Sequence, residues 1–556
     1  MRKWNTILSV LMLLIFMIHG IMGSFMLNGV GSSAGKLLAW IGVGILVVHT
    51  VIGVILTVQS LQTAENGCNV KLVSSLPSER AQSVMAEGGI NVALNTKDEN
   101  DSPEEHFTDT IKAACGLADP NAVWGMTQAA PELVHWLLKL GVKFNMSGYD
   151  DVDLRNFGGQ KKKRTAFAQS DTGKQIMTAM IDAVRRKEAS GMVERFSHHS
   201  FLTLRLCGNI CCGCVIRDEY SQETVELPGD AVIVATGGMH GLFGNTTGSL
   251  SNTGEVTAEL FRLGVPLANG EMIQYHPTTV KCGGKRMLIS EAARGEGGRL
   301  FAMKDGKQWY FMEEKYPELG NLMPRDITAR EIWKVSHESE VFLDMTEISE
   351  EIISNKLSGL ADDCMTYLHK DIRKEPVSVL PGIHYFMGGI LVDEQHRTPI
   401  QNLYAAGECC AQYHGANRLG GNSLLGALYG GRVAAKSACE QADAVDLSCA
   451  TQIDFPPASQ ISEIKQLNKV MQETMGVVRN ENTLLNGIQT VQALTGNLPL
   501  LGMAVLKSAL ARKESRGAHW REDYPKSNDD DYLKTTVARF DGKQIQISFV
   551  PVPERR

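Results

Sequence analysis

The sequence predicts an α/β fold built on parallel strands, preceded by two transmembrane helices. Two observations carry this prediction. Near the N-terminus, Lys, Arg, Asp and Glu are absent from Trp4 to Gly35 and again from Leu37 to Ala64. Farther along, short apolar strands run into glycine-rich turns, which is typical of buried parallel strands that alternate with helices.

The overall composition is that of a globular protein. The chain of 556 residues has 55 Lys and Arg against 62 Asp and Glu, which gives a formal net charge of −7. Its 43% hydrophobic and 21% charged residues exclude a disordered or fibrous chain. A pI near 6.1 without a basic block excludes nucleic acid as the main partner. At about 150 residues per domain, we expect roughly three to four domains.

The twelve cysteines lack the even spacing of a secreted disulfide framework, which favours reduced thiols in a cytosolic compartment. A metal site is the alternative for one tight group, although no partner pair stands at zinc or iron–sulfur spacing elsewhere. The group consists of Cys207, Cys211, Cys212 and Cys214.

The apolar head provides two candidate membrane spans. Thr6–Leu27 and Leu37–Val58 each supply about twenty mostly apolar residues, enough to cross a hydrocarbon core of about 30 Å. Arg2 and Lys3 precede the first span, so the positive-inside rule places the N-terminus and the body of the protein in the cytoplasm, at the cell (inner) membrane. A cleaved signal peptide is the alternative for the first run, but the run is long and a second span follows it.

His19 and His49 fall near the middle of these two spans. Ionisable residues are costly inside a membrane and point to a function, and one imidazole from each of two helices can ligate a b-type haem. An interhelical hydrogen bond is the alternative.

Beyond the head, the sequence predicts the second half of a β-α-β unit. Leu61–Gly67 has the pattern of a helix that ends on a glycine, and Asn69–Val73 that of a parallel strand. The first strand and a glycine-rich, dinucleotide-binding turn should lie a dozen or more residues upstream of Gly67. At that spacing stands Val51–Leu56, inside the second span, with the single glycine Gly53, so we expect the first strand and its loop to be missing.

Later segments combine glycine-rich turns with cationic side chains. Ala231–Gly238 and Asn402–Glu408 are strands that enter such turns. The run His414–Leu424 places Arg418 among glycines just before a helix, an arrangement that suits a carboxylate bound beside a flat cofactor. Three further clusters contribute His276, the pair Glu291 and Arg294, and Arg325, which together suffice for an anion with two carboxylates.

At these motifs the chain resembles the flavoprotein subunit of succinate dehydrogenase and fumarate reductase, from about Leu61 to the C-terminus. The resemblance rests on the order and spacing of the following segments: Ala86–Asn91, Ala235–Gly238, Gln274–Thr278, Arg294–Gly298, Pro324–Asp326, His384–Gly389, His414–Leu424, and Arg516–Pro525.

The resemblance implies an FAD-dependent oxidoreductase that interconverts fumarate and succinate. Hydride would pass between flavin N5 and one alkene carbon, and Arg325 would protonate the other, with Glu291 and Arg294 relaying protons. The residues implied to bind the substrate are His276, Ser290, His384 and Arg418.

The implied cofactor is FAD, and the residues implied to contact it are Ser74, Gly88, Gly89, Thr236, Gly237, Gly238, Glu255, Glu408, Ser423 and Leu424. Gln82 stands where membrane-bound relatives have the histidine that bonds to FAD, so the resemblance implies non-covalent FAD and leans toward fumarate reduction. The family usually passes electrons through an iron–sulfur subunit, which we therefore expect as a partner.

The resemblance also implies the domain organisation: a Rossmann-like FAD-binding domain, an inserted capping domain and a C-terminal helical domain. The expected boundaries are a membrane anchor at 1–60, the FAD-binding domain at 61–255 and 384–439, the capping domain at 256–383, the helical domain at 440–525 and a final segment at 526–556. Two alternatives stay open. One is a related flavin enzyme on another small carboxylate, such as an L-aspartate oxidase, and the other is a silent membrane protein unable to hold FAD.

Overall fold

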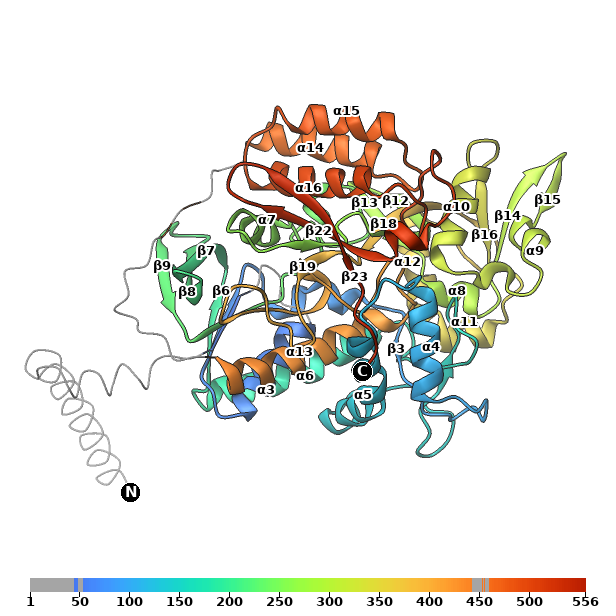
Figure 1. Ribbon diagram of the computed structural model, residues 1–556. Helices are drawn as coiled ribbons and strands as arrows, with labels where there is room; N and C mark the ends of the chain where they lie inside the picture. Colours follow the sequence, from blue (N-terminus) through green and yellow to red (C-terminus); the bar gives the residue numbers. More distant parts are fainter. Residues whose placement is uncertain (1–44, 49–53, 443–452, 454, 456–459) are drawn as a thin grey trace, which may run out of the picture. The chain divides into compact units, whose positions relative to one another are not determined.

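The computed structural model describes residues 45–48, 54–442, 453, 455 and 460–556 (Figure 1). The chain divides into two units, Met1–Gly44 and Ile45–Arg556. All of the described residues belong to the second unit.

A five-stranded parallel sheet organises this unit. Its order is β20 (Leu403–Ala405), β10 (Ala231–Val234), β1 (Ile45–Val48), β2 (Val70–Ser74) and β6 (Val193–Ser197). β1 is the central strand, and Ile45 pairs with Ala231 on one side and with Val70 on the other. The strands predicted within Asn69–Val73, Ala231–Gly238 and Asn402–Glu408 are confirmed.

The predicted second membrane span is wrong, because β1 lies inside it and α3 (Val54–Glu65) begins inside it. A central parallel strand is covered on both faces and needs an uncharged sequence, as a membrane span does. The prediction that the first strand is missing is wrong for the same reason. Within the part of the chain that the structure describes, no helix combines the length and apolar character that crossing a bilayer requires. The first predicted span, His19, His49 and residues 49–53 lie outside the described residues.

Helices cover one face of the parallel sheet. α3 packs there against both α6 (Thr172–Ala189) and α13 (Asn422–Gln441), and α5 (Pro120–Leu140) also packs against α6 and α13 (Figure 1). As predicted, α3 ends before a glycine, and Gly67 has the positive φ (83°) that closes such a helix. α4 (Pro103–Ala113) packs on α5.

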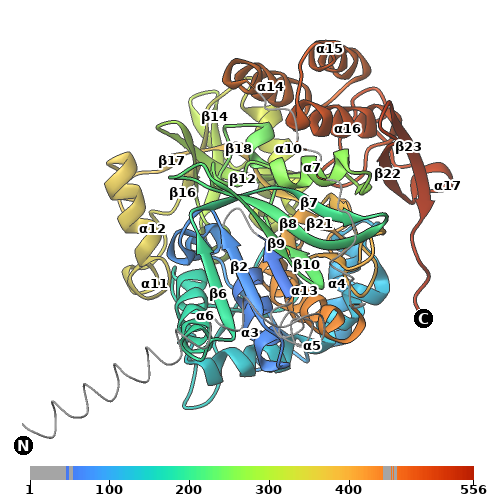
Figure 2. The same cartoon turned by 90° about the vertical axis from the view of Figure 1, so that its left-hand side faces the viewer.

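A small antiparallel sheet lies against the parallel sheet through β10 and β2. It consists of β7 (His199–Cys207), β8 (Ile210–Asp218) and β9 (Thr224–Pro228) (Figure 2). Cys211 and Cys214 are fully buried in β8, and they pack in an apolar cluster with Val232 and Val234 of β10. Among the described residues, no group of His, Cys, Asp and Glu is arranged to hold a metal ion.

The segment between β10 and β20 forms two further sheets with their own apolar core. One is β13 (Lys285–Leu288), β12 (Ile273–Cys282) and β18 (Leu380–Phe386). The other is β15 (Lys307–Trp309), β14 (Arg299–Lys304), β16 (Val341–Asp344) and β17 (Val377–Ser378). The helices of this segment are α7 (Glu255–Arg262), α8 (Glu291–Gly295), α9 (Phe311–Lys315), α10 (Arg325–Val335), α11 (Glu350–Lys356) and α12 (Ser358–Asp363).

The C-terminal part begins with three packed helices: α14 (Ile461–Thr474), α15 (Glu481–Val491) and α16 (Asn497–Ala511). The short helix α17 (Asp529–Tyr532) and the hairpin β22 (Lys534–Phe540) and β23 (Ile545–Pro551) follow. The hairpin joins β11 (Leu267–Ala268), β19 (Gly389–Leu391) and β21 (Cys410–Ala411) in one sheet, which ties the end of the chain to its middle.

Candidate active site

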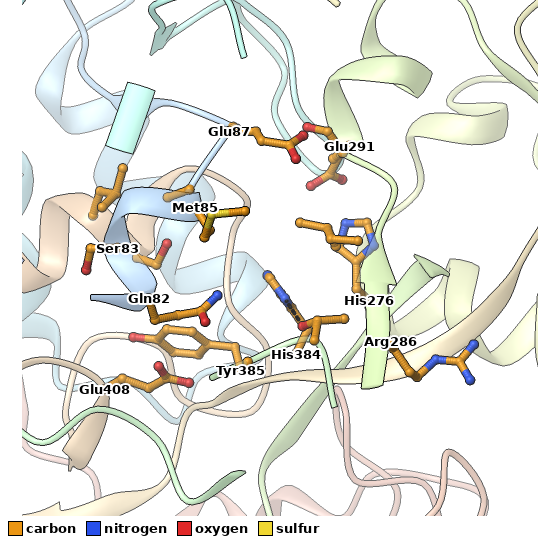
Figure 3. Close-up of a pocket in the computed structure, with 18 of the residues that line it drawn as sticks. Gln82, Ser83, Met85, Glu87, His276, Arg286, Glu291, His384, Tyr385 and Glu408 are labelled. Atoms are coloured by element: carbon orange, nitrogen blue, oxygen red, sulfur yellow. Dashed lines mark hydrogen bonds between the residues drawn. The ribbon is translucent and has the colours of Figure 1, made fainter. Parts of the chain in front are cut away.

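A cavity of about 370 Å³ lies where several elements meet (Figure 3). Its walls come from the 3₁₀ helix η2 (Gln82–Met85), the loop after η2, β12, β18, and the first turns of α8, α10 and α13. Twelve residues predicted from the sequence line it: Gly88, Gly89, Gly237, His276, Ser290, Glu291, Arg325, His384, Glu408, Arg418, Ser423 and Leu424.

Glu291 joins two buried arginines. Its Oε2 accepts from Arg325 Nε at 2.8 Å and from Arg325 Nη2 at 2.5 Å, while its Oε1 accepts from Arg294 Nη2 at 3.1 Å. Burial alone would raise the pKa of Glu291, but Arg325 and then Arg294 outweigh burial and lower it. The carboxylate therefore stays charged, and Arg294, Glu291 and Arg325 form one hydrogen-bonded chain that ends in the cavity.

Gln274 lies between Arg325 and another buried arginine of the site, Arg418. Its Nε2 donates to the backbone oxygen of Arg418 at 2.8 Å and to Asn417 Oδ1 at 2.9 Å, and its Oε1 accepts from Arg325 Nη1 at 3.1 Å. The Arg418 guanidinium lies 4.2 Å from the centre of the Tyr385 ring, and its Nε is buried without a partner. Burial and then Arg325 lower the pKa of Arg418 to about 9, so it remains charged at neutral pH, and no carboxylate of the described residues forms an ion pair with it.

Two histidines complete the polar lining, and their ring centres are 5.2 Å apart. His384 Nδ1 is 2.8 Å from Thr247 Oγ1, whereas His276 Nε2 is buried without a partner. Burial lowers the pKa of both rings, and neighbouring groups lower it further: Arg325 acts most on His276, and His276 acts most on His384. Both are therefore neutral at pH 7, and His276 Nε2 is free to bond a ligand.

Sequence reasoning gave Glu87 no role, although it stands in the motif Ala86–Asn91. Its carboxyl lies on the same side of the cavity as that of Glu291 (Figure 3), it is hydrogen-bonded to Ser290, and its Oε2 is buried without a partner. Burial and then Asp363 raise the pKa of Glu87 to about 8. Near neutral pH this group is mostly protonated, unlike Glu291 close by. Gln274, Tyr385 and Thr247 were also missed as site residues.

Glycines line the cavity at positions where a side chain would crowd its neighbours or strain the backbone. A Cβ on Gly88 would come within 3.0 Å of the Phe157 ring. Gly237 and Gly421 have φ of 71° and 86°, a conformation that side chains disfavour. Burial raises the pKa of Glu408, which also lines the cavity, to about 7, and this carboxyl accepts a hydrogen bond from the Phe386 N–H. The described residues therefore fit a dinucleotide cofactor.

Five predicted site residues do not line the cavity: Ser74, Thr236, Gly238, Glu255 and Arg294. Arg294 reaches it only through Glu291. The Ser74 hydroxyl donates to its neighbour Leu76 O, and Glu255 begins α7. Gly238 packs against the lining, because a Cβ there would meet Phe386 and Glu408.

Comparison with known proteins identifies similar chains along nearly the whole length. The family model for an FAD binding domain matches residues 58–424, and that for the fumarate reductase flavoprotein C-terminus matches residues 494–555. The succinate dehydrogenase flavoprotein subunit of Bacillus subtilis is 37% identical, over 89% of this chain and 95% of its own.

Two further proteins are similar to this chain over most of its length. The 8-methylmenaquinol:fumarate reductase flavoprotein subunit of Wolinella succinogenes is 31% identical, over 88% of each chain. A solved structure of a mutated E. coli quinol fumarate reductase is similar with a TM-score of 0.83 at 25% identity, over 92% of this chain and 96% of that one.

Proposed function

The chain belongs to the family of succinate dehydrogenase and fumarate reductase flavoproteins, which are FAD-dependent oxidoreductases, and on this premise we propose that it interconverts fumarate and succinate. One observation carries the substrate class. Arg325 and Arg418, joined through Gln274, face a cavity that also presents the unpaired His276 Nε2. Two guanidiniums and neutral imidazole donors suit a small molecule with two carboxylates.

The proposed roles follow from these contacts. Arg418, His276, His384 and Ser290 bind and orient the two carboxylates, and the buried positive charge stabilises the negative charge that develops in the reaction. Arg325 donates a proton to the substrate carbon, and a guanidinium can do so only beside a partner that restores the proton at once. The chain of hydrogen bonds through Glu291 to Arg294 supports that role. FAD, when bound, supplies the transfer of hydride.

We further propose that FAD is held without a covalent bond and that the chain favours fumarate reduction. Gln82 lines the cavity at the start of η2, and its amide lacks the nucleophilic ring nitrogen through which a histidine bonds to flavin. A flavin that is not covalently attached generally has a lower potential, which favours the reductive direction. Gly88, Gly89, Gly237, Glu408, Ser423 and Leu424 are the residues that would hold it.

The electron partner and the location are proposals as well. We propose an iron–sulfur subunit as partner and a place at the cytoplasmic side of the membrane, because the relatives are named as flavoprotein subunits, one of them of a menaquinol enzyme. The domain boundaries expected from the sequence also remain a proposal.

Flavin content and substrate choice test the function. We expect a yellow protein that releases all of its FAD on acid precipitation and reduces fumarate with a reduced dye as donor. Arg325→Gln should abolish turnover but retain flavin, whereas Arg330→Gln, on the same helix and away from the cavity, should behave as wild type. A colourless protein, or turnover of aspartate in place of fumarate, would falsify the proposal.

A further inference from the structure

Two free cysteines from distant parts of the chain meet outside the cavity. Cys68 lies between α3 and β2, and Cys439 lies in the last turn of α13. Their Sγ atoms are 3.0 Å apart, although 371 positions separate them in the sequence. Since a disulfide has an S–S distance of about 2.0 Å, an approach of about 1 Å would close the bond.

The surroundings leave this pair accessible to a small oxidant. Both thiols are half-buried at the edge of the apolar cluster that packs α3 and α13 against the parallel sheet. Cys211 and Cys214, by contrast, are fully buried inside β8. Burial and then the contact with Cys68 raise the pKa of Cys439 to about 12, so Cys439 stays protonated at neutral pH. Because a protonated thiol is a poor nucleophile, we assign the resolving step to Cys439 and the first step to Cys68.

We infer that Cys68 and Cys439 form a reversible disulfide when the protein meets hydrogen peroxide. The Cys68 thiolate attacks one peroxide oxygen, the O–O bond breaks, and Cys68 becomes a sulfenic acid as hydroxide leaves. The Cys439 sulfur then attacks the Cys68 sulfur. The S–S bond forms, the S–O bond breaks, and water leaves with the Cys439 proton. Two thiols have lost two electrons and one peroxide has become two waters; a dithiol reductant reverses the reaction.

The position of the bond gives it a consequence for the active site. The first turn of α13 contributes Ser423 and Leu424 to the cavity, and its last turn carries Cys439. Cys68 is fixed to the end of α3, because its N–H donates to Thr63 O at 3.1 Å. A disulfide would tie α13 to the turn between α3 and β2 and restrict the unfolded chain. The oxidised protein should therefore melt at a higher temperature and lose its cofactor more slowly.

The experiment uses the purified holoprotein. It is fully reduced, freed of reductant, treated with stoichiometric hydrogen peroxide, alkylated with N-ethylmaleimide and digested for peptide mapping. Cys207 is disulfide-bonded and re-forms its own bond, so the readout is specific to the pair: we expect a cross-linked peptide containing Cys68 and Cys439, loss of alkylation at both residues and an upward shift in melting temperature, all reversed by dithiothreitol. Cys68→Ser and Cys439→Ser should each abolish the cross-link and the shift. Cys115→Ser, which removes a half-buried thiol elsewhere, should retain both.

Three outcomes would overturn the inference: both thiols remaining alkylatable after peroxide, Cys68 reaching the sulfinic acid without a cross-link, or a cross-link from either residue to Cys449. Peptide mapping of the wild-type protein decides among them even if a serine variant folds poorly. Activity is not part of the readout, so a failure here is distinct from a failure of the proposed reaction.

Discussion

Replacing Glu291 by glutamine tests whether one carboxylate sustains both the fold of the site and proton delivery. Glu291 is the acceptor for two arginines and for the Gly158 N–H at 3.1 Å. A glutamine keeps one acceptor oxygen but replaces the other with an amino group. In the Glu291→Gln variant, that amino group would face a guanidinium donor of Arg325 or Arg294, and two buried positive charges would lose their counter-ion.

The structure sets the magnitude of the effect. Arg325 and Arg294 are only 6% and 2% exposed, so water does not replace the lost partner. Removing one partner of a buried ion pair costs about 3–5 kcal/mol, within a typical total stability of about 5–15 kcal/mol, so the variant should fold but be less stable. Losing a positioned proton-transfer group lowers turnover by about 10²–10⁴-fold. The added positive charge should leave fumarate binding as tight as before or make it tighter.

The assay measures flavin content, denaturant unfolding, kcat and the dissociation constant of fumarate on the same preparation. Glu331→Gln is the matched control, because Glu331 is also paired with two cations, Lys315 and Lys334, but lies outside the cavity lining. Its kcat should stay at the wild-type level. A Glu291→Gln variant with full flavin and wild-type kcat would refute the relay, and weaker fumarate binding would refute the electrostatic argument.

Three further predictions concern single residues of the cavity. Arg418→Lys should weaken fumarate binding by about tenfold or more, because an ammonium cannot bind a carboxylate through two parallel hydrogen bonds as a guanidinium can; an unchanged dissociation constant would contradict the assigned role. The free energy of unfolding of the apoprotein should fall as pH rises, because buried Glu87 then loses its proton. Burial and then Asp363 raise its pKa from 4.5 to about 8, so the folded state binds this proton more tightly and free energy of unfolding is lost between those pH values. Glu87→Gln should lack that part of the loss, which denaturant unfolding at several pH values measures against wild type. Gly421→Ala should lower FAD content after purification, since φ is 86° and a Cβ would meet the Asn91 amide; full FAD occupancy would show that the turn tolerates a side chain.

The sequence predicted much of the active site because the motifs carry both the chemistry and its spacing. Arg325 and Glu291 stand at helix starts and His384 on a strand, and the folded chain brings all three to one cavity. Gln274 was missed as a site residue, because a neutral amide becomes informative only when it is seen between two arginines.

The error at β1 has a physical cause. A run of about twenty uncharged residues is what a membrane span requires. A central parallel strand followed by a packed helix can have the same uncharged sequence. Only the pairing with Ala231 and Val70 separates the two, and Ala231 lies far along the chain from the run itself. Glu87 likewise depends on distant chain, because its raised pKa arises from burial and from Asp363.

The central place of β1 governs the order in which the chain can be assembled during synthesis. β1 can pair with β10 only after more than 180 further residues have been synthesised, and β10 can pair with β20 only after about 170 more. One edge of this apolar strand thus stays unpaired on the nascent chain until β10, which ends at Val234 of 556 residues, has been synthesised. Any truncation meant to remove the apolar head must stop before Ile45, because cutting farther would separate β20 and β10 from β2 and β6.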